Sequence, residues 1–124
     1  MADLRVLVID DDKTMVAVMS AALKAGGFQV SAAFDAMQGF MFATKDPPDL
    51  ILLDINMPAG GGVGAWNRLQ HSARTQSIPV VFVTIESKPG LEQEVLRQGA
   101  LGFIHKPFDP STFADRVRGF LEKK

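Results

Sequence analysis

The sequence contains no cysteine. Disulfide bonds, thiolate metal sites and cysteine nucleophiles are therefore excluded, and a reducing compartment is compatible with this composition. The sequence also has no apolar run close to the ~20 residues that a membrane-spanning helix needs, and its first residues, MADLRVLVID, lack the basic and long apolar regions of a secretory signal. We therefore expect a cytoplasmic protein without a membrane partner.

Charge of one sign is not in excess either. The 13 Lys and Arg residues and the 14 Asp and Glu residues leave a formal net charge of −1. This balance gives no attraction toward nucleic acid, so proteins or small ligands are the expected partners. The 124 residues, 47% of them hydrophobic, suffice for one domain with its own core, and no linker, repeat or low-complexity stretch divides them.

Five short apolar runs alternate with stretches of helical character. The runs are LRVLVI (4–9), FQVSAAF (28–34), DLILLD (49–54), IPVVFVT (78–84) and LGFIH (101–105). Within them, LILL and VVFV are apolar at successive positions, which is typical of strands covered on both faces of a parallel sheet. The pattern predicts an α/β fold, a (βα)5 arrangement with a five-stranded parallel sheet and helices on both sides.

Helical spacing is clearest near the two ends of the chain. The segment 13–25 carries apolar residues at this spacing and stops at Gly26-Gly27. A similar apolar stripe occurs in the last segment, at Phe113, Val117, Phe120 and Leu121. Asp12 stands just before the first of these helices, so we interpret it as an N-cap whose side chain accepts a backbone N–H, and not as a metal ligand.

The second predicted helix, DAMQGFMFATK (35–45), is unusually apolar. One face is predicted to hold Met37, Phe40, Met41 and Thr44. Phe42 then falls on the opposite face, with Gln38 and Lys45. Phe42 either enlarges the core or is exposed. We favour exposure, with Phe42 in a surface for a partner, because exposed aromatic residues are enriched in binding patches.

Charged and polar residues stand at the carboxyl ends of the predicted strands: Asp10, Asp11, Asp54, Thr84 and Lys106. Ligands of open α/β sheets bind at this edge, so these side chains are expected to meet in one crevice. Three carboxylates would repel one another there by several kcal/mol at an effective dielectric of ~20, more than one lysine can balance. Mg²⁺ is the predicted cation, because it takes one or two carboxylates and keeps other positions open.

Such a site suits phosphoryl transfer, in which a cation and a lysine neutralise the transferring oxygens and a carboxylate accepts the group as an aspartyl phosphate. Asp54 is the candidate nucleophile because it ends the most apolar strand. The backbone carbonyl of Asn56 offers a further oxygen ligand for the metal. Thr84 would donate its hydroxyl to one phosphoryl oxygen, and Lys106 would pair with another.

Four motifs, VLVIDDD, DLILLDINMP, VVFVT and FIHKPF, resemble those of the receiver domain of two-component response regulators. The resemblance covers all 124 residues, with the motifs in the family's order. It implies the flavodoxin-like strand order 2-1-3-4-5. The roles it implies are phosphoacceptor for Asp54, acidic pair for Asp10 and Asp11, metal ligand for the Asn56 carbonyl, switch hydroxyl for Thr84, phosphate-pairing amine for Lys106 and switch aromatic for Phe103.

The resemblance also implies partners. The phosphoryl group would come from a histidine kinase or a histidine phosphotransfer protein docked near helix 13–25. Its arrival would bias a two-state equilibrium through Thr84 and Phe103. No output domain follows the last predicted helix. We therefore expect 1–124 to be a single receiver domain, a phosphoacceptor and not an enzyme, that is a monomer or weak dimer and signals in trans to a downstream target protein.

The sequence departs from the family pattern at three positions. Gly61 stands where an acidic residue is usual, which predicts a more mobile loop because glycine resists ordering. Ile85 replaces a small residue, so it is expected to narrow access to Asp54 and to slow phosphorylation and hydrolysis. Phe103 has no phenolic hydroxyl, so switching would rest on packing alone. The Lys106-Pro107 bond matches the family's lysine followed by a cis proline.

Two alternatives to a phosphorylated receiver stay open at this stage. One is a degenerate receiver that binds partners without phosphorylation, which Ile85 and the glycine-rich loop would favour. The other is a phosphohydrolase of the haloacid dehalogenase type, which also forms an aspartyl phosphate. That enzyme class needs an aspartate two residues after its nucleophile, where this chain has Asn56.

The segment GGGVGA (60–65) formally fits a dinucleotide fingerprint, with Glu86 ending the next strand. The fingerprint needs its first glycine directly after a strand, whereas INMPA separates Asp54 from Gly60. We therefore assign no nucleotide site. The isolated His71 and His105 are expected at the surface without a functional role.

Overall fold

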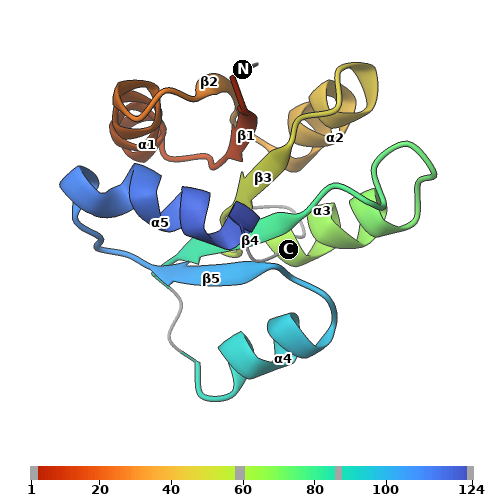
Figure 1. Cartoon of the computed structure of the whole chain (residues 1–124). Helices are drawn as coiled ribbons and strands as arrows, with labels where there is room; N and C mark the ends of the chain where they lie inside the picture. The colour runs from red at the N-terminus through yellow and green to blue at the C-terminus, as the bar shows by residue number, and fades with distance from the viewer. Residues whose placement is uncertain (1–2, 58–60, 86–87, 123–124) are drawn as a thin grey trace.

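Parallel strands alternate with helices along the whole described chain (Figure 1). The computed structural model describes residues 3–57, 61–85 and 88–122. The strands are β1 (Arg5–Ile9), β2 (Gln29–Ala33), β3 (Leu50–Leu53), β4 (Val80–Thr84) and β5 (Gly102–His105). The helices are α1 (Lys13–Ala25), α2 (Ala36–Lys45), α3 (Gly61–Gln70), α4 (Leu91–Arg97) and α5 (Pro110–Glu122). The five strands form one sheet in the order β2-β1-β3-β4-β5, so the predicted α/β fold and strand order are confirmed.

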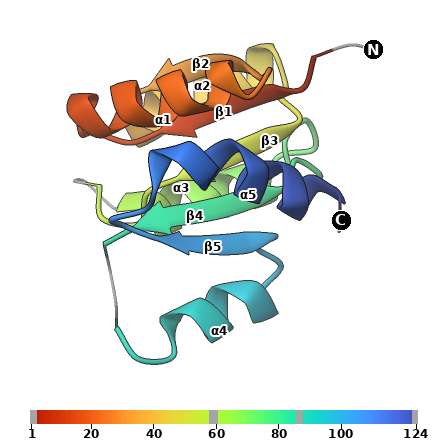
Figure 2. The ribbon, with the colours of Figure 1, turned by 60° about the vertical axis from the view of Figure 1, so that its left-hand side comes forward.

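The sheet is covered on both faces, with α1 and α5 on one side and α2 and α3 on the other (Figures 1 and 2). Val6 and Val8 of β1 pack in the cluster that includes α1 and α5. Leu7 and Ile9, which alternate with them, pack in the cluster that includes α2, α3 and α4. Successive side chains of a strand point to opposite faces, so a strand with helices on both sides must be apolar at every position.

The start and end of α1 are those predicted. Asp12 Oδ1 accepts hydrogen bonds from the backbone N–H groups of Thr14, at 3.0 Å, and Met15, at 3.1 Å. The helix ends at Ala25, and the N–H of the C-cap residue Gly26 donates back to Ala22 O at 3.2 Å. Asp12 is therefore a helix N-cap, and its side chain satisfies donors that have no partner inside the helix.

The α2 face predicted to hold Met37, Phe40, Met41 and Thr44 is only partly buried, with Phe40 packed against the core. Met37 and Met41 are 63% and 58% exposed, whereas Gly39 and Ala43 are buried. The helix lies so close to β1 that a Cβ atom on Gly39 would stand 2.5 Å from Ile9 Cδ1. Small residues therefore make the contact with the sheet, and the large apolar residues are displaced to the flanks. The expected exposure of Phe42 is confirmed, at 41%.

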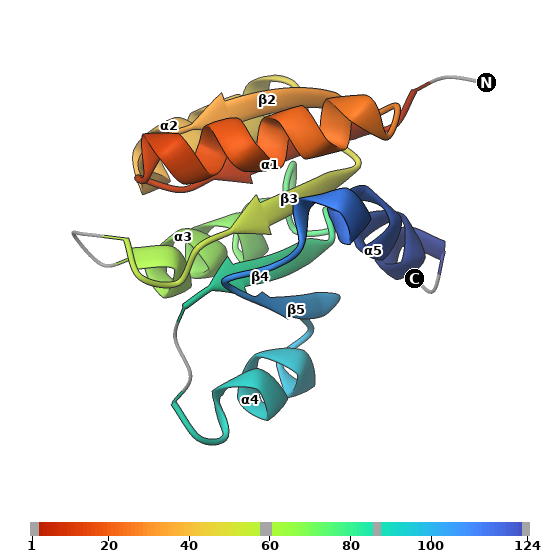
Figure 3. The same ribbon diagram turned by 90° about the vertical axis from the view of Figure 1, so that its left-hand side faces the viewer.

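All five strands run in the same direction, so their carboxyl ends share one edge of the sheet; Figure 3 shows the arrowheads of β3 and β4 pointing to it. This edge holds the residues that follow β1 and β3 and the last residue of β4. None of the helices in the described part of the chain is long and apolar enough to cross a membrane.

Candidate functional site

An acidic cluster forms where β1 and β3 end. Ile9 and Leu53 are paired across these adjacent strands, so the residues that follow them are brought together. One carboxylate oxygen from each of Asp10, Asp11 and Asp54 lies within 4.8 Å of the others. Asp10 and Asp54 are buried and Asp11 is exposed. The predicted meeting of these three side chains is therefore observed.

Lys106 reaches into the cluster from the end of β5. Its Nζ atom lies 2.6 Å from Asp10 Oδ2 and 3.7 Å from Asp54 Oδ2. Its backbone N–H donates to Thr84 O at 2.9 Å, which ties the segment after β5 to the end of β4. The Lys106-Pro107 bond is cis, as the resemblance predicted.

Backbone N–H groups orient two of the carboxylates. The N–H of Asp12 donates to Asp10 Oδ1 at 2.9 Å, and the N–H of Asn56 donates to Asp54 Oδ1 at 3.1 Å. Each of these bonds spans two residues, so the turn that follows the strand holds the carboxylate at its end. The second oxygen of Asp54 faces Lys106.

Burial raises the pKa of the Asp10 carboxyl above its ordinary value. The hydrogen bond from Lys106 and the backbone N–H of Asp12 act in the opposite direction and do not fully offset the burial, and the charge of Asp54 adds to the increase. The buried negative charge is therefore only partly balanced by the lysine. A further cation near Asp10 would favour its ionised form.

The hollow above the cluster has an apolar rim. It is lined by Asp11, Asp12, Met15, Asp54, Asn56, Ile85, Lys106 and Pro107. Ile85 follows β4, is 68% exposed and lines the same hollow as Asp54. The narrowing of access to Asp54 stays a prediction. Thr84, the last residue of β4, is fully buried.

Gly61 and Gly62, which belong to the glycine-rich segment, are closely packed against the backbone that follows β3. Both are buried and begin α3, while residues 58–60 lie outside the described part of the chain. A Cβ atom on Gly62 would stand 2.0 Å from Asp54 O, and one on Gly61 would stand 2.7 Å from Ile55 O. The sequence showed a run of glycines but not this contact, which lets α3 approach the backbone of Asp54. The predicted loop mobility stays a prediction.

At the start of α3, one glycine N–H of the formal dinucleotide fingerprint is already bonded within the chain. The glycine N–H of residue 62 donates to Ile55 O at 3.0 Å, within the chain itself. Gly60 and Glu86 of the formal dinucleotide fingerprint lie outside the described residues. The structure therefore offers nothing in favour of the nucleotide reading.

Phe103 lies on β5, paired with Phe82 of β4, and only 6% of it is exposed. The proposed switch aromatic thus already occupies an inward position. His105, two residues on, is exposed as predicted but not isolated. Its ring centroid is 4.8 Å from that of Phe103, and its Nε2 atom is 3.0 Å from Glu92 Oε1 of α4. His71 is exposed as expected.

Comparison with known proteins decides the family. The model of the response regulator receiver domain matches residues 6–118. The chain belongs to this family. PilH of Pseudomonas aeruginosa is 33% identical over 117 residues, which cover 94% of this chain and 97% of PilH. The response regulator PleD of Caulobacter vibrioides is 36% identical over 120 residues, but the chain spans only 26% of its length.

Solved receiver structures share the fold. The chemotaxis protein CheY4 of Vibrio cholerae superposes with a TM-score of 0.87 at 28% identity, covering 96% of this chain and 99% of CheY4. Receiver domains are modules of two-component systems that accept a phosphoryl group on an aspartate from histidine kinases or phosphotransfer proteins, at an acidic pocket that binds Mg²⁺. Membership of this family decides against the haloacid dehalogenase reading.

Proposed function

We propose that Asp54 is the phosphoacceptor of this receiver domain. The observation that carries the proposal is the convergence of three carboxylates within 4.8 Å of one another, with Lys106 Nζ within 4.0 Å of two of them. Asp54 is favoured among the three because it directly follows the central strand β3 and lines the hollow. Asp10 does not line that hollow.

The donor set fits Mg²⁺. Carboxylate and carbonyl oxygens are its preferred ligands, and it commonly binds through one or two carboxylates together with a phosphoryl oxygen. Asp10, Asp11 and Asp54, with the backbone carbonyl of Asn56, would hold the ion. When bound, it supplies positive charge that neutralises the transferring oxygens.

In the transfer step, an oxygen of Asp54 attacks the phosphorus of a phosphohistidine. The new P–O bond forms as the P–N bond breaks, and the imidazole leaves with the electron pair of that bond. Lys106, 3.7 Å from Asp54 Oδ2, would pair with a phosphoryl oxygen, and Thr84 would donate its hydroxyl to another. Two donors beside the incoming charge would favour the transfer, because groups that are already near it need little rearrangement.

Phosphorylation of Asp54 would change the binding surface of the domain through Thr84 and Phe103. Because Phe103 is already buried, phosphorylation would hold it inward and so bias a two-state equilibrium that exists beforehand. The surface affected is the face of α4, β5 and α5, where a downstream target would bind in trans, while the phosphodonor docks near α1. The match to nearly the full length of PilH supports a receiver domain that signals in trans. We propose that this domain acts in the cytoplasm as a monomer or weak dimer.

A degenerate receiver that is not phosphorylated is the second candidate. Ile85 on the rim of the hollow and Gly61 in place of an acidic residue are the observations in its favour. In that case the domain would bind its partners in one state only.

One experiment separates the two candidates. The purified protein is mixed with Mg²⁺ and acetyl phosphate or phosphoramidate, and its mass is followed. A single phosphoryl adduct that is absent from Asp54→Asn and from samples with EDTA supports phosphorylation of Asp54. No adduct under any of these conditions supports the degenerate receiver, and an adduct that persists in Asp54→Asn places the phosphoryl group on another residue.

A further inference from the structure

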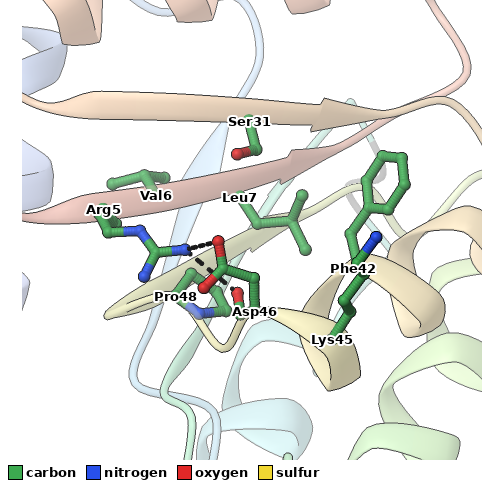
Figure 4. A pocket seen from close by; sticks show the side chains of 8 residues that line it. All are labelled: Arg5, Val6, Leu7, Ser31, Phe42, Lys45, Asp46 and Pro48. Carbon is green, nitrogen blue, oxygen red and sulfur yellow. Dashed lines mark hydrogen bonds and ion pairs between the residues drawn. The ribbon is translucent and has the colours of Figure 1, made fainter.

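A second cavity lies away from the acidic cluster, between α2 and strands β1 and β2 (Figure 4). Its volume is about 300 Å³, and it is lined by Arg5, Val6, Leu7, Ser31, Phe42, Lys45, Asp46 and Pro48. Arg5 opens β1, whereas Asp10 follows its end, and at ~3.3 Å per residue the two are roughly 15 Å apart along the strand. An occupant of this cavity would therefore not block phosphorylation of Asp54.

The cavity walls combine an apolar interior with a polar rim. Figure 4 shows Leu7 in the middle, Phe42 and Lys45 on one side and the Arg5–Asp46 pair on the other. Leu7 is buried, while Phe42 is 41% exposed and also lines the cavity. An apolar hollow beside an exposed aromatic ring suits an apolar side chain of a partner, because its contact area is large and its shape is already formed.

The charges around the cavity favour an anionic partner. Arg5 forms an ion pair with Asp46, and its backbone N–H donates to Asp49 Oδ2 at 2.7 Å, so these two carboxylates balance its charge. No carboxylate within residues 3–57, 61–85 and 88–122 pairs with Lys45, which is exposed at the rim. Lys45 is therefore a positive charge at the opening that no ion pair of the described residues balances.

The neighbouring helix extends this positive surface. Neither α2, AMQGFMFATK, nor α3, GGVGAWNRLQ, contains an acidic residue. Arg68 of α3 lies over the ring of Phe40, 4.7 Å from its centroid, and Arg74 Nε donates to Thr44 O at 2.9 Å. Acidic side chains are confined to the ends of α2, where Asp35 caps the helix and Asp46 binds Arg5. The exposed face of α2 is thus both apolar and basic.

We propose that the α2 surface, defined as Met37, Met41, Phe42 and Lys45 with the cavity beside Phe42, binds an acidic segment of a partner protein. An apolar side chain of that segment enters the cavity, and the carboxylates beside it pair with Lys45 and the two arginines of the α3 side. A second copy of this chain is disfavoured, because a symmetric contact would bring identical positive charges together. This site goes beyond phosphoryl transfer and acts whether or not Asp54 is phosphorylated.

Synthetic peptides of equal length provide the probe. The first alternates Leu and Phe with Asp and Glu, the second has Lys in place of every acid, and the third has Ser in place of every Leu and Phe. Binding to the full chain is followed by fluorescence polarisation and by amide chemical shifts. The proposal expects binding of the first peptide alone, with shifts grouped around Leu7, Phe42 and Lys45. Equal binding of the second peptide, or shifts grouped elsewhere, would overturn it.

Matched variants identify the surface. Phe42→Ala and Lys45→Glu should each weaken binding of the first peptide by about fivefold or more, as expected for residues at the centre of an interface. Leu96→Ala, which removes a side chain that is 40% exposed on α4, and Lys24→Glu on α1 should leave it unchanged. Asp54→Asn should also leave it unchanged, so failure of the proposed phosphorylation would not imitate failure of this site.

Two further outcomes would replace the proposal. Binding to phosphatidylglycerol vesicles that is lost in Lys45→Glu, without binding of any peptide, would assign the surface to an anionic membrane. Concentration-dependent self-association that Phe42→Ala abolishes would assign it to a second copy of the chain.

Discussion

Lys106 Nζ lies 2.6 Å from Asp10 Oδ2, although the two residues are 96 positions apart in the sequence. Both side chains are nearly buried, with 7% of the lysine and 1% of the aspartate exposed. The same nitrogen is farther from Asp54 Oδ2, at 3.7 Å. In this state the lysine is engaged chiefly with Asp10, while Asp54 remains within its reach.

Asp10→Asn should stabilise the metal-free protein at neutral pH. Burial raises the pKa of Asp10, so the folded state binds its proton more tightly than the unfolded chain, and the free energy of unfolding falls as pH rises from the ordinary value of 3.8 through the raised pKa. Lys106 keeps Asp54 as a partner in the variant. Urea unfolding in EDTA should therefore show that Asp10→Asn raises the free energy of unfolding, and that the increase is larger at about pH 7 than at about pH 4.

With Mg²⁺ present, the unchanged protein should become more stable than Asp10→Asn. The ion binds the ionised carboxylates, and the variant has one carboxylate ligand fewer. Asp115→Asn is the control, since that carboxylate is 84% exposed and should give no comparable pH-dependent gain. A gain that is the same at both pH values would contradict the assignment to Asp10.

The neighbouring acids should separate into a metal ligand and a helix cap. Asp11→Ala should abolish Mg²⁺-dependent phosphorylation by acetyl phosphate, because its carboxylate lies within the acidic cluster. Asp12→Ala should keep that reaction and lower the free energy of unfolding by about 1 kcal/mol, through loss of its two bonds to the first turn of α1. Loss of Mg²⁺ binding in Asp12→Ala would show that the acidic pair is assigned one residue too early.

Two glycines of α3 should respond in opposite directions to the same substitution. Gly62→Ala should lower the free energy of unfolding by about 1–3 kcal/mol, because its Cβ would stand 2.0 Å from Asp54 O and would force α3 away from the site. Gly64→Ala meets no atom within 4 Å and should raise stability by about 0.5–1 kcal/mol through helix propensity. Thermal unfolding of both variants measures the difference, and equal stability of the two would exclude the contact with Asp54.

Ile85→Ala should speed both phosphorylation of Asp54 by acetyl phosphate and hydrolysis of the product. Its side chain is 68% exposed on the rim of the hollow, so its removal opens the approach at little cost in stability. Met41→Ala is the matched control, with 58% exposure on α2 and no place in that rim. Rates followed by mass spectrometry that are unchanged in Ile85→Ala would show that Ile85 does not limit access to Asp54.

The strands, the first helix cap and the location of the candidate site can be predicted from short patterns in the sequence. The successive apolar residues of LILL and VVFV already require cover on both faces, because neighbouring side chains of a strand point to opposite sides. Asp12 before KTMVAVM is a cap for reasons confined to one helical turn. The acids and the lysine stand at strand ends in the sequence, and parallel strands bring such ends to one edge. The strand order, by contrast, came only with the resemblance to receiver domains, because alternation alone is compatible with several orders.

The distances between elements were decided by the tertiary structure. Gly39 and Ala43, not Met37 and Met41, face the sheet because α2 lies close to Ile9, and hydrophobicity along the chain carries no measure of that closeness. The contact of Gly62 with the backbone of Asp54 has the same origin. The sequence by itself determined which segments are strands and which residues stand at the edge of the sheet where the strands have their carboxyl ends. Only the tertiary structure decided which residues touch, because contact depends on how closely and at what rotation the packed helices approach the sheet.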